Sequence, residues 1–155
     1  MATYRTVRKL TLQEASYLAG LIDGEGTITL SRKERNAERT AVVSIANTEL
    51  CLLEYPLEVI GAGRISSKKT LKANHSPSFT YQISGRQAVA LIEQIAPFLR
   101  SYKRERALLI LKDYVRLTLR NGRYTQIQLE ERNKFVECFF ADRANKNNPR
   151  GRVIF

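Results

Sequence analysis

The sequence predicts an α+β domain in which two β-hairpins form one antiparallel sheet with helices on one face only. Segments 27–35 and 78–84 alternate apolar and polar residues as half-buried strands do, and each has a strand-like neighbour, 40–46 or 64–69. Apolar residues recur at helical spacing before, between and after the hairpins. The polar faces of the hairpins match, which predicts one sheet that carries its helices on the other side.

The first helix is predicted over residues 12–23, after a capping box formed by Thr11 and Glu14. Its buried face would consist of three apolar residues at helical spacing: Leu18, Leu21 and Ile22. Gly20 and Gly24, four residues apart, leave a strip without side chains where another helix can approach closely.

The first hairpin is predicted to consist of strands Thr27–Arg35 and Thr40–Ala46, joined by a turn at Asn36–Arg39. In the first strand Ile28 and Leu30 would face the core. The opposite face would be polar and basic, with Thr29, Ser31, Lys33 and Arg35.

A second helix, Thr48–Ile60, should be kinked or interrupted by Pro56 and should end at the glycines of residues 61–63. The second hairpin follows, with strands Arg64–Lys69 and Ser78–Ser84, and a second set of outward polar residues: Arg64, Ser66, Lys68, Thr80, Gln82 and Ser84. The remaining chain is predicted to be helical, over Arg86–Ile95, Lys103–Leu119 and Gln126–Ala141. The basic tail, residues 143–155, is expected to be mobile without a partner.

Composition narrows the class of partner. The chain has 155 residues, one domain's worth, and a net charge of +11. Residues 59–92 contain no acid but several Lys and Arg residues, which favours a polyanion such as nucleic acid over a membrane surface. No apolar run is long enough to span a bilayer, so we expect a soluble, intracellular protein. Cys51 and Cys138 lie in apolar stretches and are expected to be reduced core thiols.

The most informative segment is residues 18–26, LAGLIDGEG, where the apolar first helix ends in two acids and two glycines. Gly24 and Gly26 permit a sharp turn and hold Glu25 between them. A carboxylate beside an exposed backbone carbonyl can bind a hard cation. This segment resembles the signature of the LAGLIDADG homing endonucleases, and the order of later elements, from Thr11 to Ala141, is similar to that family.

The resemblance implies an αββαββα fold whose sheet forms a DNA-binding saddle. It also implies site-specific cleavage of both strands of a long, near-palindromic DNA target by metal-dependent phosphodiester hydrolysis. In the family the acid at the Glu25 position and the carbonyl at the Gly24 position bind the catalytic metal, Mg²⁺ or Mn²⁺, while the acid at Asp23 is structural. Glu25 stands where many relatives have Asp, so the metal geometry should differ in detail.

Two further residues match family positions. Asn47 follows the second strand, where relatives often have a polar residue that orders the attacking water; a cap for the next helix is the alternative. Lys103 resembles the basic residue near the scissile phosphate, with Arg104 and Arg106 as neighbouring alternatives. His75 is the only histidine and is interpreted as a surface residue.

Only one copy of the signature is present, and cutting two strands takes two active sites. The resemblance therefore implies a homodimer in which the first helices pack across a two-fold axis. The residues expected in that interface are Ala19, Gly20, Asp23 and Gly24. The outward residues of the strands would read base edges in the major groove.

Two other functions remain open from the sequence. An intron maturase, which binds intron RNA, could use the same scaffold without cutting. A noncatalytic DNA-binding regulator could use it only to grip a site. The helix-end carboxylate Glu25 favours the nuclease, because a binding protein does not require a metal ligand there.

Overall fold

A computed structural model describes residues 5–68, 73–74 and 76–141. His75 and the predicted mobile tail lie outside these residues. The elements follow the order α1 (Leu12–Glu25), β1 (Gly26–Ser31), β2 (Thr40–Asn47), α2 (Cys51–Ile60), β3 (Arg64–Lys68), β4 (Ser78–Ser84), α3 (Gly85–Ile95), the 3₁₀ turn η1 (Ala96–Phe98), α4 (Lys103–Leu109), the π-helical segment η2 (Ile110–Tyr114), α5 (Val115–Leu117) and α6 (Gln126–Ala141).

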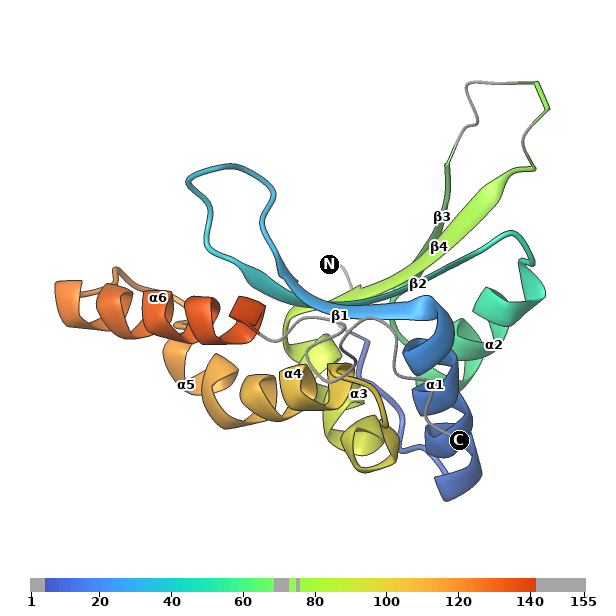
Figure 1. Cartoon of the computed structure of the whole chain (residues 1–155), viewed down its shortest axis with the longest axis horizontal. Coiled ribbons are helices and arrows are strands. Elements are labelled where there is room, and N and C mark those ends of the chain that lie inside the picture. The colour runs from blue at the N-terminus through green and yellow to red at the C-terminus, as the bar shows by residue number, and fades with distance from the viewer. Residues whose placement is uncertain (1–4, 69–72, 75, 142–155) are drawn as a thin grey trace, which may run out of the picture.

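The four strands form one antiparallel sheet in the order β1-β2-β4-β3. Figure 1 shows that this sheet is curved like a saddle, with the helices gathered under its convex face and the concave face left uncovered. Each hairpin contributes two strands, and β2 and β4 meet at the centre. The predicted fold class, two hairpins in one sheet with helices on one side, is confirmed.

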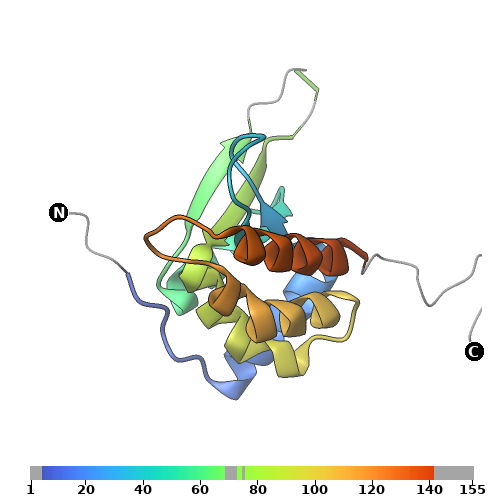
Figure 2. The same ribbon diagram turned by 90° about the vertical axis from the view of Figure 1, so that its left-hand side faces the viewer.

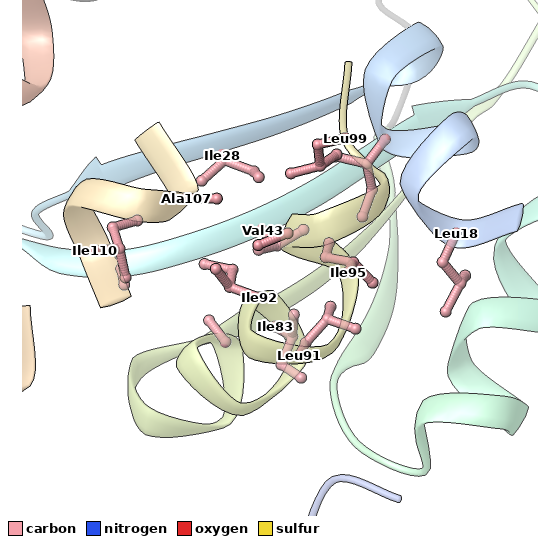
Figure 3. Packing of buried hydrophobic residues seen from close by; sticks show 14 of the residues in the cluster. Leu18, Ile28, Val43, Ile83, Leu91, Ile92, Ile95, Leu99, Ala107 and Ile110 are labelled. Atoms are coloured by element: carbon pink, nitrogen blue, oxygen red, sulfur yellow. The ribbon is translucent and has the colours of Figure 1, made fainter. Parts of the chain in front are cut away.

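The hydrophobic core lies between the convex face of the sheet and the helices, as Figure 3 shows. Ile28, Val43 and Ile83 point into it from three strands, and α1 and α3 add further fully buried residues: Leu18, Ile22, Leu91, Ile92 and Ile95. Burial of these side chains supplies most of the driving force for folding, at about 25 cal/mol per Å² of apolar surface.

The first helix begins as predicted. The Thr11 hydroxyl accepts a hydrogen bond from the backbone N–H of Glu14, and the Glu14 carboxylate accepts one from the N–H of Thr11. The helix continues to Glu25, two residues beyond its predicted end. A Cβ atom at Gly26 would lie 2.7 Å from Cα of Ile22, so only glycine permits this direct passage from α1 into β1.

Several predicted boundaries and environments were wrong. Strand β1 ends at Ser31, and residues 32–39 form a loop. The second helix begins at Cys51 and runs through Pro56. Both Cys51 and Cys138 are exposed, because each lies on the outer side of its helix, α2 or α6. The predicted helix 103–119 ends at Leu117 and contains the π-helical segment.

The free edge of β1 is covered by two arginines. Nη1 of Arg39 donates to the carbonyl of Leu30 at 3.0 Å, and Nη1 of Arg106 donates to the carbonyl of Ile28 at 3.0 Å. Both guanidinium groups lie over the ring of Phe140, at 4.8 and 5.7 Å from its centroid. The carbonyls of Leu30 and Ile28 on this edge strand are therefore hydrogen-bonded within the chain. No helix among the described ranges is long and apolar enough to cross a membrane.

Candidate active site and nucleic-acid interface

The last turn of α1 presents Glu25 at one end of the sheet. Glu25 and Gly24 are exposed, and β1 starts directly after them. Gly26 pairs with Ile45, so Asn47, two residues further along β2, lies at the same end of the sheet. The structure thus places Gly24, Glu25 and Asn47 around the junction between α1 and the sheet.

Lys103 reaches this junction from the start of α4. Its Nζ atom donates hydrogen bonds of 2.8 Å to the carbonyls of Ile22 and of Asp23. The last carbonyl groups of a helix have no intrahelical partner, so the ammonium group stabilises the end of α1. Burial lowers the pKa of Lys103, while the negative charges of Asp23 and Glu25 act in the opposite direction. Lys103 therefore fixes the backbone that carries Glu25.

Asp23 braces the same turn through its side chain. Its carboxylate accepts hydrogen bonds from the backbone N–H groups of Arg100 and Ser101, at 2.8 and 3.2 Å, and from the hydroxyl of Ser101. These contacts join α1 to the loop before α4. All three donors belong to the same chain, so the carboxylate of Asp23 is used for local structure.

Asn47 does not cap α2, whose N-cap residue is Leu50 and has no side-chain capping hydrogen bond. The Oδ1 atom of Asn47 accepts a 2.9 Å hydrogen bond from the N–H of Glu49, in the turn that precedes α2.

Arg104 and Arg106, the neighbours of Lys103 in the sequence, do not take its place at the junction between α1 and the sheet. Arg104 is exposed, and the guanidinium of Arg106 contacts the edge of β1 and the ring of Tyr102.

A bare strip runs along the exposed side of α1. Gly20 and Gly24 are exposed, and a Cβ atom built on either would meet no atom within 4 Å. Neither residue has a positive φ, so the described chain itself does not require glycine at either position. Tyr17 and Leu12, which are 45% and 73% exposed, lie on the same helix. Ala19 has no exposed surface and packs in the protomer's own core, so it cannot contribute to an external contact.

The uncovered concave face carries most of the predicted base-reading residues. Strand register places their side chains on one side of the sheet, since Thr29 faces Val42, Val42 faces Ser84, and Gln82 faces Arg64. The residues on this face are Thr29, Ser31, Arg64, Ser66, Lys68, Thr80, Gln82 and Ser84. Lys33 and Arg35 are exposed but lie in the 32–39 loop instead of on β1.

The prediction omitted the outer residues of β2. Thr40 and Ser44 share the concave face, because they pair with Ser31 and Thr27 of β1. The sequence did indicate these outward positions, because residues 40, 42, 44 and 46 alternate with the buried residues Ala41, Val43 and Ile45.

A groove of about 740 Å³ occupies the part of this face farthest from Glu25. Its lining includes polar residues of β1, β2 and β4 and four cationic residues: Arg5, Arg32, Lys33 and Arg64. Arg5 was not predicted; its carbonyl accepts a hydrogen bond from Nε2 of Gln87, which holds the N-terminal segment beside the sheet. The groove is suited to a polyanion by its charge.

The family comparison covers the first half of the domain. A model of the LAGLIDADG-like domain matches residues 12–96, which include α1 through α3 and all four strands.

Solved structures with the same fold are DNA complexes. The homing endonuclease I-CvuI in complex with its target is 17% identical, with a TM-score of 0.61, over 92% of this chain and 87% of that chain. The archaeal intron-encoded homing endonuclease I-Vdi141I complexed with DNA is 18% identical, with a TM-score of 0.56, over 90% of this chain and 89% of that chain. The meganuclease I-SmaMI bound to uncleavable DNA is 17% identical, with a TM-score of 0.56, over 89% of this chain but only 45% of that chain.

Proposed function

The chain belongs to the LAGLIDADG-like domain family, and on this basis we propose that it is a homing endonuclease that cuts both strands of a long, near-palindromic DNA site. The observation that carries the proposal is the position of Glu25. Its exposed carboxylate stands at the end of α1, beside an uncovered sheet face with polar and basic side chains. Similar folds bind DNA in I-CvuI and I-Vdi141I.

Glu25 and the carbonyl of Gly24 are suited to hold a Mg²⁺ or Mn²⁺ ion. Among the described residues no three His, Cys, Asp or Glu side chains gather into a metal site. Mg²⁺ does not require such a cage, since it is usually held by one or two carboxylates together with water and substrate phosphates. Glu25 has hard oxygen donors, and it is exposed where a phosphate could approach. When bound, the ion would supply an activated water and charge stabilisation for the phosphate.

The chain's own residues would position these groups. Lys103 fixes the end of α1 through the carbonyls of Ile22 and Asp23. Asp23 joins the same turn to residues 100–101. Asn47 has an amide that could order the attacking water, because only its Oδ1 atom is engaged by Glu49. The contacts of Lys103 and Asp23 hold the backbone that carries Glu25 in place before DNA binds, which favours efficient positioning.

We further propose that the active form is a homodimer paired through α1. The strip at Gly20 and Gly24 has space for the backbone of a second helix, and nothing in the described chain explains glycine at either position. Two copies related by a two-fold axis would place two Glu25 sites on the two strands of one duplex. The two concave faces would then contact a near-palindromic site, with the outward strand residues facing the major groove.

The decisive experiment compares the wild type with Glu25→Gln on one duplex, selected by binding from a randomised pool. In Mg²⁺ we expect the wild type to cut both strands, and EDTA to abolish cutting. The variant should bind within about twofold of the wild type and cut more than about 100-fold more slowly, since even outer-shell metal partners cost 10- to 100-fold. Glu93→Gln, the same change at an exposed residue of α3, is the matched control.

Other outcomes identify other functions. Normal cutting by Glu25→Gln would contradict the role of this carboxylate. Specific DNA binding without cutting in any divalent metal would indicate a noncatalytic regulator. Preference for a structured intron RNA over every duplex would indicate a maturase.

A further inference from the structure

The side chain of Arg132 in α6 is buried beneath the β1–β2 hairpin. It is only 3% exposed, although most arginines in proteins lie at the surface. Its guanidinium connects three segments of the chain. Nε donates to Oε2 of Glu38 at 2.5 Å, Nη2 donates to the carbonyl of Arg39 at 2.6 Å, and Nη1 donates to the carbonyl of Leu117 and the hydroxyl of Thr118.

These contacts fix the end of the loop that carries Lys33 and Arg35. Residues 32–39 have no strand partner, and apart from a backbone hydrogen bond between Ala37 and Glu34 the described contacts of the loop are made by side chains. Arg132 holds two consecutive residues at its end, and Arg39 is held again through its own bond to Leu30. Figure 2 shows α6 lying directly below this hairpin. The C-terminal helix, which lies outside the family match, therefore supports the loop.

Glu38 is one of the residues that line the groove on the concave face. Among the described residues that line this groove, Glu38 is the only acid, and the cationic residues Arg32, Lys33 and Arg64 share the lining. Its side chain is 49% exposed. Arg132 engages Oε2, and no described residue donates a hydrogen bond to Oε1. One carboxylate oxygen is therefore held by Arg132, while the other has no described donor and belongs to a half-exposed side chain in the lining of the groove.

A carboxylate is unfavourable on a surface that is proposed to bind DNA, because it repels phosphates. Its presence there suggests a specific hydrogen-bonding role. In the major groove the exocyclic amine of cytosine is a hydrogen-bond donor, and carboxylates accept from it. The ion pair with Arg132 offsets the charge of Glu38 and sets its orientation. An acceptor that is oriented before binding loses little entropy when it meets a base.

We propose that Glu38, oriented by Arg132, is a specificity-determining residue that accepts a hydrogen bond from the N4 amine of one cytosine in each half-site. This inference rests on the proposed DNA-binding function. It assigns Arg132 as a positioning residue, which acts through Glu38 without touching DNA.

The test uses the selected duplex and a series of duplexes with every single base substituted. At one position in each half-site, replacing cytosine should weaken wild-type binding by about 5- to 150-fold, the range measured for a good base contact. Glu38→Gln should remove that preference alone. Its carbonyl can accept from Arg132 and its amide then turns a donor to the base, so bases with an acceptor should become favoured. Glu34→Gln, an exposed acid in the same loop but not in the groove, is the matched control.

Arg132→Met provides an independent readout, with folding checked by thermal unfolding. It should abolish the same cytosine preference while leaving the preferences read by residues of β3 and β4 unchanged, because those strands make none of the contacts of Arg132. The inference is overturned if Glu38→Gln keeps the cytosine preference, or if it weakens binding equally for every duplex, as a purely structural brace would. A wild type that selects no sequence would overturn the proposed function itself, and this inference with it.

Discussion

Tyr81 is fully buried, and its hydroxyl donates a 2.7 Å hydrogen bond to the carbonyl of Ala62. Burial raises the pKa of Tyr81 well above its ordinary value. The unfolded chain would lose this proton near pH 10, whereas the folded chain keeps it. The stabilisation is therefore complete below about pH 10 and falls as the pH rises above that value. We expect the free energy of unfolding to decrease between about pH 9.5 and 11.5, measured by denaturant titration.

The comparison with Tyr81→Phe isolates this effect. The variant should be about 1–3 kcal/mol less stable at pH 8, because the carbonyl of Ala62 loses its partner, and its stability should depend less on alkaline pH. Burial lowers the pKa of Lys103, so this residue makes the free energy of unfolding rise with alkaline pH, opposite to the effect of Tyr81. The test is therefore the difference in pH dependence between the wild type and Tyr81→Phe. Equal alkaline slopes in wild type and variant would contradict the prediction. Tyr17→Phe, at an exposed tyrosine, is the control.

Single residues differed in how well the sequence predicted them. The capping box at Thr11 and Glu14 was predictable because both partners lie within one turn. Asp23 was expected to be structural, and its partners lie 77 and 78 residues away, where no local pattern could identify them. The role expected of Lys103 near a phosphate stays a prediction, whereas the two backbone carbonyls that its ammonium group binds lie about 80 residues away and were not predicted.

At the scale of the element, α1 supplies both the carboxylate and the proposed dimer contact. Gly20→Gln should leave the fold of the protomer intact, because a side chain there meets no atom of the described chain. It should weaken dimerisation at least tenfold, because the added side chain would separate the two helices. Sedimentation equilibrium of both proteins over a range of concentrations measures this change.

Gly63→Ala is the contrasting variant. Its Cβ would lie 2.6 Å from the Tyr81 hydroxyl at a φ of 96°, so it should lower the melting temperature without a direct effect on association. A Gly20→Gln protein that remains a dimer of wild-type affinity would exclude α1 as the contact surface.

Elements were predicted well where pairing followed the hydrophobic pattern. The alternation of apolar and polar residues in β1 and β4 predicted their outward faces correctly. A one-residue shift in strand register would turn all the apolar side chains of a strand from the core to the solvent. The end of β1 was wrong because the polar alternation continues past Ser31, whereas pairing stops at the Ser31–Thr40 pair. Beyond it, Arg132 and Arg39 determine the path of the loop through contacts that span 93 and 9 residues.

At the scale of the whole molecule, the basic residues are expected to set the salt dependence of DNA binding. Replacing Lys33 or Arg35 by alanine should weaken binding to all duplexes and flatten the plot of log K against log salt by about one unit for each lost phosphate contact. Binding measured between 50 and 300 mM KCl tests this. Lys112→Ala, in the helical layer, should leave the slope unchanged. Wild-type slopes in both loop variants would remove this loop from the DNA contact.

The overall architecture was the most predictable level, because hairpin order and matched polar faces leave few alternatives for four antiparallel strands. The placement of the C-terminal helices was not predictable, since it depends on buried contacts such as that of Arg132 with Glu38. The proposed dimer lies beyond what one chain describes; the single signature copy and the bare strip at Gly20 and Gly24 are what support it.

The two arginines at the edge of β1 should limit aggregation of the protein at high concentration. An exposed edge strand offers unpaired carbonyls to the strands of other molecules, a common start for aggregation. Here an incoming strand would have to displace Arg39 and Arg106 from the carbonyls of Leu30 and Ile28. Neighbouring copies therefore cannot extend the sheet through β1 without breaking these bonds, which protects this edge of the sheet against strand addition.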